Sequence, residues 1–182
     1  MANKIKYGIK NVYYAKATDD GTGTLTYATP VAMPGAVSLS LDISGDVNNF
    51  YADNVVYFTS NANNGYQGDL ELALIPDGFR TDILGETLDA KGMYVERASD
   101  PQKEFALLFQ FEGDANATKY ILYNCKMTRP DIESSTTEDG IEVKTVSGEI
   151  TASPRAFDSI VKAQCANTAS TAYTNWFTTV QD

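Results

Sequence analysis

YQGDLELALIPDGFRTDILG, the stretch from Tyr66 to Gly85, decides the fold because it joins a clear strand pattern to a clear helix pattern. Its first half alternates apolar or small residues with more polar ones: Tyr66, Gly68, Leu70, Leu72 and Leu74 against Gln67, Asp69, Glu71 and Ala73. A period of two places successive side chains on opposite faces of a strand. The pattern therefore predicts a half-buried strand, with leucines on one face and carboxylates on the other.

The second half of the stretch predicts a short helix. Pro76 has no N–H to donate to a sheet, but it suits the first turn of a helix. Phe79, Ile83 and Leu84 then recur at helical spacing, and Gly85 stands where a left-handed residue commonly ends a helix. We expect this helix to fold back over the leucine face of the strand.

The chain is long enough for one domain with its own core. Its 182 residues contain no proline-rich or serine-rich linker, so residues 1–182 are interpreted as a single domain. No apolar run is long enough to cross a bilayer, and the opening residues MANKIKYGIK lack the apolar region of a signal peptide. We expect the protein to stay in the cytoplasm where it is made, without a membrane partner.

The charge balance is acidic, with 14 Lys and Arg against 24 Asp and Glu and a formal net charge of −10. Binding to phosphates needs the opposite sign, so a conventional nucleic-acid-binding surface is disfavoured. Two interpretations stay open. The acidity serves solubility, or it forms an acidic wall past which nucleic acid slides without sticking.

Strand patterns dominate the rest of the chain. Residues 37–43 alternate cleanly, and residues 105–111 are apolar on nearly both faces, which predicts a central strand covered on two sides. Residues 119–128 predict a partner strand whose inward face carries a buried free thiol, through Ile121, Tyr123, Cys125 and Met127. Weaker cues predict a linker at 86–92, a short edge strand at 93–97 and a further strand at 141–152.

These elements together predict a mainly β (α+β) fold. Strands outnumber the one main helix, and no repeat of solenoid or propeller length recurs. We expect an antiparallel β-sandwich or partly open barrel with one flanking α-helix.

The region from about residue 42 to 66 combines loop residues with large apolar ones. Asn, Asp and Gly abound there, yet the region also carries Phe50, Tyr51, Val55, Val56, Tyr57 and Phe58. A solvated loop does not normally expose so many large apolar groups. Either the region is a hairpin packed on its own domain, or it projects and buries these groups against another subunit.

The sequence offers little catalytic chemistry. The absence of histidine removes the commonest general base and metal ligand, together with every Ser-His or Cys-His pair. Asp69 and Glu71 point the same way from one strand, but carboxylates two apart are ordinarily a solvated face. No glycine-rich phosphate loop appears at a strand-to-helix junction. We therefore assign no catalytic, cofactor-binding or metal-binding residue.

Eight short runs follow one another along the chain: GIKNVYYA (Gly8 to Ala15), MPGA (Met33 to Ala36), FYADN (Phe50 to Asn54), GYQGDLELALIPDGF (Gly65 to Phe79), DILG (Asp82 to Gly85), FALLFQFEGD (Phe105 to Asp114), YILYNCKMTRP (Tyr120 to Pro130) and TASPR (Thr151 to Arg155). In this order they resemble the major tail protein (tail tube protein) family of long-tailed bacteriophages, the siphophages, and of related prophages. The resemblance covers nearly the whole chain.

The resemblance implies a structural protein of the virion rather than an enzyme. Subunits of this family form hexameric rings that stack into the hollow tail tube, through which genomic DNA passes into the host without specific binding. The implied partners are other copies of the chain, the tape-measure protein, the tail terminator and the distal tail or baseplate proteins. The protein would be made in the bacterial cytoplasm and end in the tail of the virion.

The family's architecture also suggests roles for particular regions. Its loops and terminal arms reach between rings, so residues 42–66 are the candidate stacking loop and residues 156–182 a candidate C-terminal arm. Candidates for the lining of the bore are the carboxylates Asp69, Glu71, Glu142 and Glu149. For each carboxylate the alternative, exposure on the outside of the tube or at a subunit contact, stays open.

Two other functions remain. A type VI secretion-like tube protein would share the ring-forming fold. A carbohydrate-binding β-sandwich would explain surface aromatics, acidic charge and the lack of catalytic groups. The binding module should stay monomeric and gain thermal stability from sugar, whereas a tube protein should associate as its concentration rises.

Overall fold

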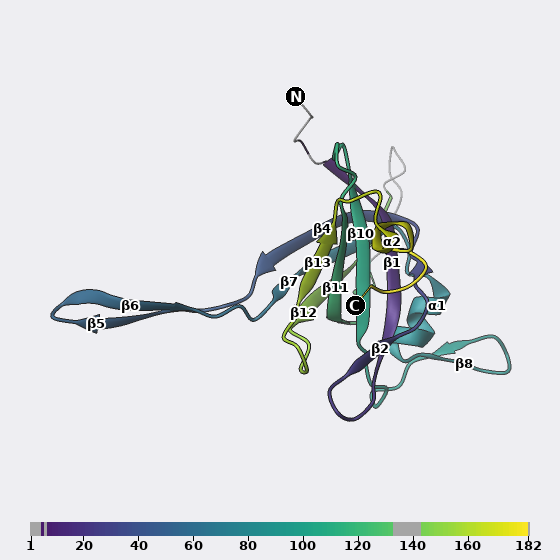
Figure 1. Cartoon of the computed structure of the whole chain (residues 1–182). Helices are drawn as coiled ribbons and strands as arrows, with labels where there is room; N and C mark the ends of the chain where they lie inside the picture. The colour runs from purple at the N-terminus through teal and green to yellow at the C-terminus, as the bar shows by residue number, and fades with distance from the viewer. Residues whose placement is uncertain (1–4, 6, 133–142, 182) are drawn as a thin grey trace, which may run out of the picture.

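The computed structural model describes residue 5, residues 7–132 and residues 143–181. Most strands form one antiparallel sheet in the order β2-β1-β10-β11-β12-β7-β4, with β3 beside β1 and β13 beside β11 (Figure 1). These strands are β1 (Tyr7–Asp19), β2 (Leu25–Tyr27), β3 (Val31–Ala32), β4 (Ala36–Ile43), β7 (Tyr66–Leu72), β10 (Phe105–Glu112), β11 (Lys119–Met127), β12 (Val146–Ser153) and β13 (Lys162–Cys165). The predicted mainly β fold with a flanking helix is confirmed.

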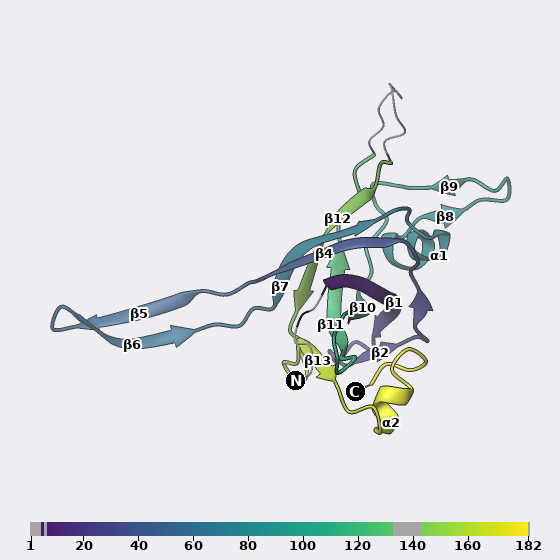
Figure 2. The ribbon, with the colours of Figure 1, turned by 90° about the horizontal axis from the view of Figure 1, so that it is seen from above.

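Two small hairpins leave this sheet. One consists of β5 (Val47–Ala52) and β6 (Val55–Asn61), and the other of β8 (Thr87–Leu88) and β9 (Tyr94–Val95). Figure 2 shows them extending from the body in opposite directions. The helical segments are α1 (Asp77–Phe79), the π-helical turn η1 (Arg80–Leu84) and α2 (Thr171–Thr174).

A hydrophobic cluster lies on each face of the central strands, and β10 contributes to both. Phe105, Leu107 and Phe109 belong to the larger cluster, whereas Ala106 and Leu108 belong to the smaller one. All five side chains are buried. The prediction that residues 105–111 form a central strand covered on two sides is therefore confirmed.

The sheet divides at β11. Residues Lys119–Leu122 pair with β13, whereas Asn124–Met127 pair with β12. Beyond β12 the sheet curls over the larger cluster, so that β4 comes to lie close to β1 (Figure 2). We call the strands β4, β7 and β12 the wing, because one of its faces covers the core and the other meets solvent.

The inward face predicted for β11 is wrong in one respect. Ile121 and Tyr123 pack in the smaller cluster, whereas Cys125 and Met127 pack in the larger one. The two pairs separate because the register shifts between Leu122 and Cys125, where β11 has one residue more than β10. An extra residue moves the following side chains to the opposite face of the sheet. Cys125 is still a buried free thiol, and its burial raises the pKa of the thiol.

Strand β7 ends earlier than its alternation predicts. Leu70 and Leu72 are fully buried, but Leu74 is 67% exposed. The Ala73 N–H donates to the Gly35 carbonyl, after which the chain turns and Ile75 enters the core in place of Leu74. The leucine face therefore consists of two residues rather than three.

The flanking helix forms where the sequence predicts it. It begins as an α-helical turn and ends as a π-helical turn. Pro76 lies just before the helix in an extended conformation, and the α-helical turn begins at Asp77. A π-helical turn follows, and Gly85 ends it in the left-handed region at φ 83°. The helix thus ends at the predicted glycine.

Three apolar side chains of this helix pack against the sheet. Phe79, Ile83 and Leu84 are all buried in the larger cluster, as their spacing predicts. The Phe79 ring packs edge-on against Tyr14 and Phe105, with centroid distances of 5.1 and 5.4 Å. The helix covers the same core as the leucine face of β7.

Two further boundaries differ from the predictions. The short edge strand predicted at residues 93–97 is present as β9, but the predicted linker at 86–92 contains β8, which pairs with β9 so that Thr87 opposes Val95. The Asp89 carboxylate accepts bonds from the backbone N–H groups of Lys91 and Met93, so a local turn joins the two strands. Strand β12 begins at Val146, and residues 141 and 142 of the predicted strand lie outside the described residues.

Most of the candidate C-terminal arm packs on the body in the single subunit. Trp176 is buried, and its indole Nε1 donates to the Tyr120 carbonyl at 3.3 Å. The Lys119 ammonium donates to the Tyr173 carbonyl at 2.8 Å. These contacts close the smaller cluster from one side. An arm-like role for residues 156–182 stays a prediction.

Candidate functional site: an apolar hairpin and an acidic sheet face

The β5–β6 hairpin stands clear of the rest of the molecule. Figures 1 and 2 show it reaching far beyond the sheet. Its large apolar side chains are between 49% and 76% exposed from Ile43 to Phe58, and the set includes Phe50, Tyr51, Val55, Val56, Tyr57 and Phe58. The hairpin therefore projects rather than packs on its own domain, and burial of its apolar groups against another subunit stays a prediction.

Local chemistry explains why this segment forms a hairpin. Ala52 opposes Val55, so only Asp53 and Asn54 make the turn. Both have left-handed φ angles, 53° and 61°, as a type I′ turn requires. Asn and Asp tolerate this conformation better than other residues with a side chain. Phe50 opposes Phe58 across the ribbon, which adds a cross-strand aromatic pair.

The base of the hairpin continues the ladder between β4 and β7. The Ser44 N–H donates to the Gly65 carbonyl at 2.9 Å, and the Asn64 N–H donates to the Ser44 carbonyl at 2.8 Å. A Cβ atom at Gly45 would lie 2.0 Å from the Ala62 carbonyl oxygen, and one at Gly65 would lie 1.9 Å from the Ala152 carbonyl oxygen. These two glycines let the strands approach closely, so the packing at the base fixes the direction of the hairpin.

The outward face of the wing carries acidic side chains without basic ones. Among the residues that the structure describes, the charged groups on this face of β4, β7 and β12 are Asp42, Asp69, Glu71 and Glu149. Asp69 opposes Glu149 directly across β7 and β12. Like charges in such a pair destabilise a sheet. The Gln67 amide donates to the Glu149 carboxylate, which offsets part of this repulsion.

The Glu71 carboxylate of this face accepts hydrogen bonds from two side chains. The Ser38 hydroxyl donates to one of its oxygens at 2.7 Å, and the Thr145 hydroxyl donates to the other. These two hydrogen bonds, that from Thr145 first, lower the pKa of the Glu71 carboxyl below its ordinary value. The acidic face therefore keeps this charge even in mildly acidic solution.

The structure brings together three of the four carboxylates proposed from the sequence. Asp69, Glu71 and Glu149 share the wing, whereas Glu142 lies outside the described residues. Sequence reasoning did not single out Asp42, although its place in the alternation of residues 37–43 puts it on the same face. Asp42 opposes Gln67, one step along the ladder toward the hairpin.

The described residues contain neither a metal-binding cluster nor a membrane-spanning helix. Within residues 5, 7–132 and 143–181, no three His, Cys, Asp or Glu side chains are grouped as a metal ion would need. No helix of this part of the chain is long and apolar enough to span a membrane.

A mainly β subunit that exposes a projecting apolar hairpin has the surface of a protein that binds a partner. Comparison with known proteins identifies the family. The model of the family described as phage tail tube protein matches residues 2–181. The chain belongs to the phage tail tube protein family, as its resemblance to major tail proteins predicts. No curated protein matches it.

Proposed function

We propose that this chain forms hexameric rings that stack into the hollow tail tube of a long-tailed phage, through which genomic DNA passes during ejection. The family match over residues 2–181 carries the proposal. Of the three functions that the sequence leaves open, this match supports the tail tube over a secretion tube or a sugar-binding module. The subunit acts as a structural element of the virion tail and catalyses no reaction.

The acidic face of the wing supplies the wall of the bore in this proposal. DNA in a narrow channel is not retained by like charge, whereas basic groups would bind its phosphates. Asp42, Asp69, Glu71 and Glu149 would then face DNA. Among the described strands β4 pairs only with β7, and its other edge supports this role, because sheets joined edge to edge around a ring leave no strand edge exposed.

The projecting hairpin supplies the contact between rings. Its apolar groups are exposed in the single subunit, and burial against another copy would remove them from water.

The tape-measure protein would occupy the bore before DNA. The tail terminator and the distal tail or baseplate proteins would meet the two ends of the tube.

Electron microscopy of the purified protein tests the proposal most directly. Negative-stain images and light scattering at low and high concentration should reveal rings or hollow tubes. Deletion of residues 46–63 should leave a folded subunit that forms no tubes of normal length. Tubes of normal length from the deleted protein would refute the stacking role. A protein that stays monomeric even with a tail-tip initiator, yet melts higher with sugar, would refute the tail tube.

The acidic wall is tested by charge reversal. Asp69→Lys should assemble normally and slow DNA ejection, because a lysine in the bore attracts phosphates. Glu112→Lys, which changes an exposed carboxylate at the end of β10 instead, serves as the matched control. Equal ejection rates in the two variants would remove Asp69 from the lining.

A further inference from the structure

The side chains of the β5–β6 hairpin divide between its two faces. Successive side chains of a strand point to opposite sides, so Phe50 and Tyr51 of β5 lie on different faces. Phe50 opposes Phe58 across the ribbon, and opposed residues share a face. Its neighbour Tyr51 opposes Val56 instead. Phe58 and Val56 are two apart on β6 and still lie on opposite faces, because the extra residue Tyr57 lies between them.

One of these faces is wholly apolar over the outer half of the hairpin. It carries two opposed pairs in succession, Phe50 with Phe58 and Ala52 with Val55. We call these four residues the apolar face. Both phenylalanines are 61% exposed, and Val55 is 59% exposed. The apolar face therefore meets water in the single subunit.

The opposite face mixes apolar and polar groups. Tyr51 and Val56 lie next to the opposed pair Asn49 and Thr59. We call these four residues the polar face. The Thr59 hydroxyl donates to the Asn49 side-chain oxygen at 2.9 Å, and all four side chains are exposed. Burial of hydroxyl and amide groups is costly unless each one finds a hydrogen-bond partner, so the polar face suits water better than an interface.

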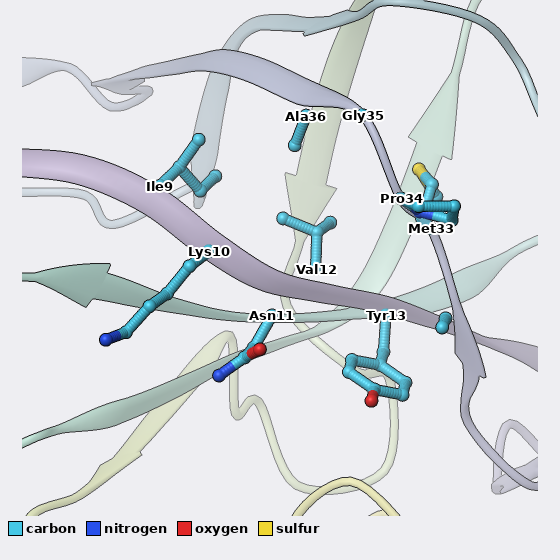
Figure 3. Close-up of a pocket in the computed structure, with 10 residues that line it drawn as sticks. Ile9, Lys10, Asn11, Val12, Tyr13, Met33, Pro34, Gly35 and Ala36 are labelled. Atoms are coloured by element: carbon cyan, nitrogen blue, oxygen red, sulfur yellow. The ribbon is translucent and has the colours of Figure 1, made fainter.

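Other apolar strand faces of the subunit are covered by the chain itself. Figure 3 shows Ile9 and Val12 projecting from β1 toward Ala36 of β4, and Val12 is buried. The hairpin has no such cover. Among the described strands β5 and β6 pair only with each other, and Figures 1 and 2 show the hairpin reaching away from the body. Cover for the apolar face must therefore come from another molecule.

The size of the apolar face indicates the kind of partner. A whole aromatic side chain has about 150–250 Å² to bury, so the two phenylalanines leave roughly 250 Å² in water. A stable interface between two proteins buries about 800 Å² on each partner. A contact of this size is weak alone, but it gains strength when many identical contacts form together. Stacked rings of one chain provide that repetition.

We propose that the apolar face of the β5–β6 hairpin packs against a second copy of this chain in the next ring, while the polar face stays in water. The inference rests on the proposed function, since it names the side of the stacking hairpin that makes the contact. A one-sided contact also fixes the direction from which the next ring approaches. A hairpin that was apolar on both faces would accept a neighbour from either side.

Two adjacent valines test this assignment. Val55 belongs to the apolar face and Val56 to the polar face, and both are exposed. Val55→Glu and Val56→Glu therefore make the same change one residue apart. We expect the concentration for half-maximal light scattering to rise at least about tenfold for Val55→Glu, because burial of an unpaired charge is costly. Val56→Glu should raise it less than about threefold, the scale of an exposed charge.

A second matched pair removes rings instead of adding charge. Phe50→Ser and Tyr51→Ser change consecutive residues of β5 that lie on opposite faces. Phe50→Ser should weaken assembly at least about tenfold, and Tyr51→Ser should leave it near that of the wild type. Because these four residues are exposed, the melting temperature of the unassembled subunit should stay close to that of the wild type in all four variants.

The sign of the added charge gives a further control. Val55→Lys should weaken assembly as much as Val55→Glu does, because the cost of burying an unpaired charge does not depend on its sign. Stronger assembly with lysine would show that this side of the hairpin meets an acidic surface through water, and it would refute the apolar contact.

Other outcomes would also overturn the proposal. Equal losses from Val55→Glu and Val56→Glu, or a larger loss from Val56→Glu, would refute a one-sided contact. If none of the variants changed assembly while the wild type formed tubes, a second copy would not cover the apolar face, and the tail tube function would stand. Failure of the wild type to assemble, even with a tail-tip initiator, would count against that function itself.

Discussion

Strand β10 and the β5–β6 hairpin are built from the same kinds of residue but lie in opposite environments. β10 is rich in Phe and Leu and is buried on both faces, because one hydrophobic cluster lies on each side of it. The hairpin is rich in Phe, Tyr and Val, and every large apolar side chain in it is exposed. Apolar patterning therefore predicts a strand in both places, but it does not say which molecule supplies the cover.

The difference separates two kinds of stability. Residues of β10 contribute to the folding of one chain, whereas residues of the hairpin contribute when another chain covers them. Substitutions in the two regions should therefore affect unfolding and assembly to different degrees.

Phe105→Ala should produce the largest loss of stability. The side chain is fully buried and packs on Phe79 of the flanking helix. Removal of a buried ring leaves a cavity and costs about 3–5 kcal/mol. Urea denaturation of the subunit measures this loss. Phe58→Ala in the hairpin is the control, because it makes the same substitution at an exposed phenylalanine. Equal losses in the two variants would show that the hairpin is packed in solution.

Gly65→Ala should be the next most damaging change, because it acts where the two regions join. The new Cβ would lie 1.9 Å from the Ala152 carbonyl oxygen, at a φ of 102°. The steric clash and the unfavourable backbone angle together should lower the free energy of unfolding by about 1–3 kcal/mol. Gly92→Ala, at a φ of 81° with no atom within 4 Å, isolates the cost of the backbone angle. If thermal melting gives equal shifts for both, the close approach at the base is unimportant.

Phe58→Ala should change the isolated subunit little and its assembly strongly. Loss of the cross-strand contact with Phe50 costs about 0.2–1 kcal/mol. Sedimentation at several concentrations should find the variant monomeric where the wild type forms larger species. Thr59→Ala on the same strand is the small-residue control. Wild-type assembly by Phe58→Ala would exclude the hairpin as the interface.

Glu71→Gln should have the smallest effect, and one that depends on pH. A carboxyl whose pKa is lowered by folding stabilises the folded state above its ordinary range, and this gain is lost as the pH falls through the lowered pKa. The melting temperature of the wild type should exceed that of the variant at pH 7. The difference should begin to shrink as the pH falls to the ordinary range of a glutamate, about pH 4, and close once the pH is below the lowered pKa.

The two donors of Glu71 provide the control for this pH series. Ser38→Ala combined with Thr145→Ala removes both hydroxyl groups that bond the carboxylate. In that background Glu71→Gln should change the melting temperature equally at both pH values. A difference that persists in the background would assign the pH dependence to another group.

Local patterns predicted most of the fold. The strand at Tyr66, the end of the helix at Gly85 and the two-sided burial of residues 105–111 all follow from the spacing of residues close in sequence. The errors arose where distant backbone sets the geometry. The register shift opposite Phe105 turned Cys125 to the other face, and the bond from Ala73 to Gly35 ended β7 before Leu74.

The candidate surfaces were predictable in part. The alternation of β7 placed Asp69 and Glu71 on one face, but it could not show that Glu149 would lie opposite Asp69. That pairing depends on the order of the strands, which no local pattern encodes.

The ribbon from β4 to β7 is one continuous piece, with the acidic face at its root and the apolar hairpin at its tip. Mechanically it is a lever that the close packing at Gly45 and Gly65 holds at its base. A force that tilts the tip is transmitted to the strands that bear Asp69 and Glu71, because backbone hydrogen bonds between Ser44 and Gly65 and between Asn64 and Ser44 link the two pairs of strands. If the tip engages one ring and the root lines the next, strain applied at one end of such a tube would travel through these levers from wall to wall.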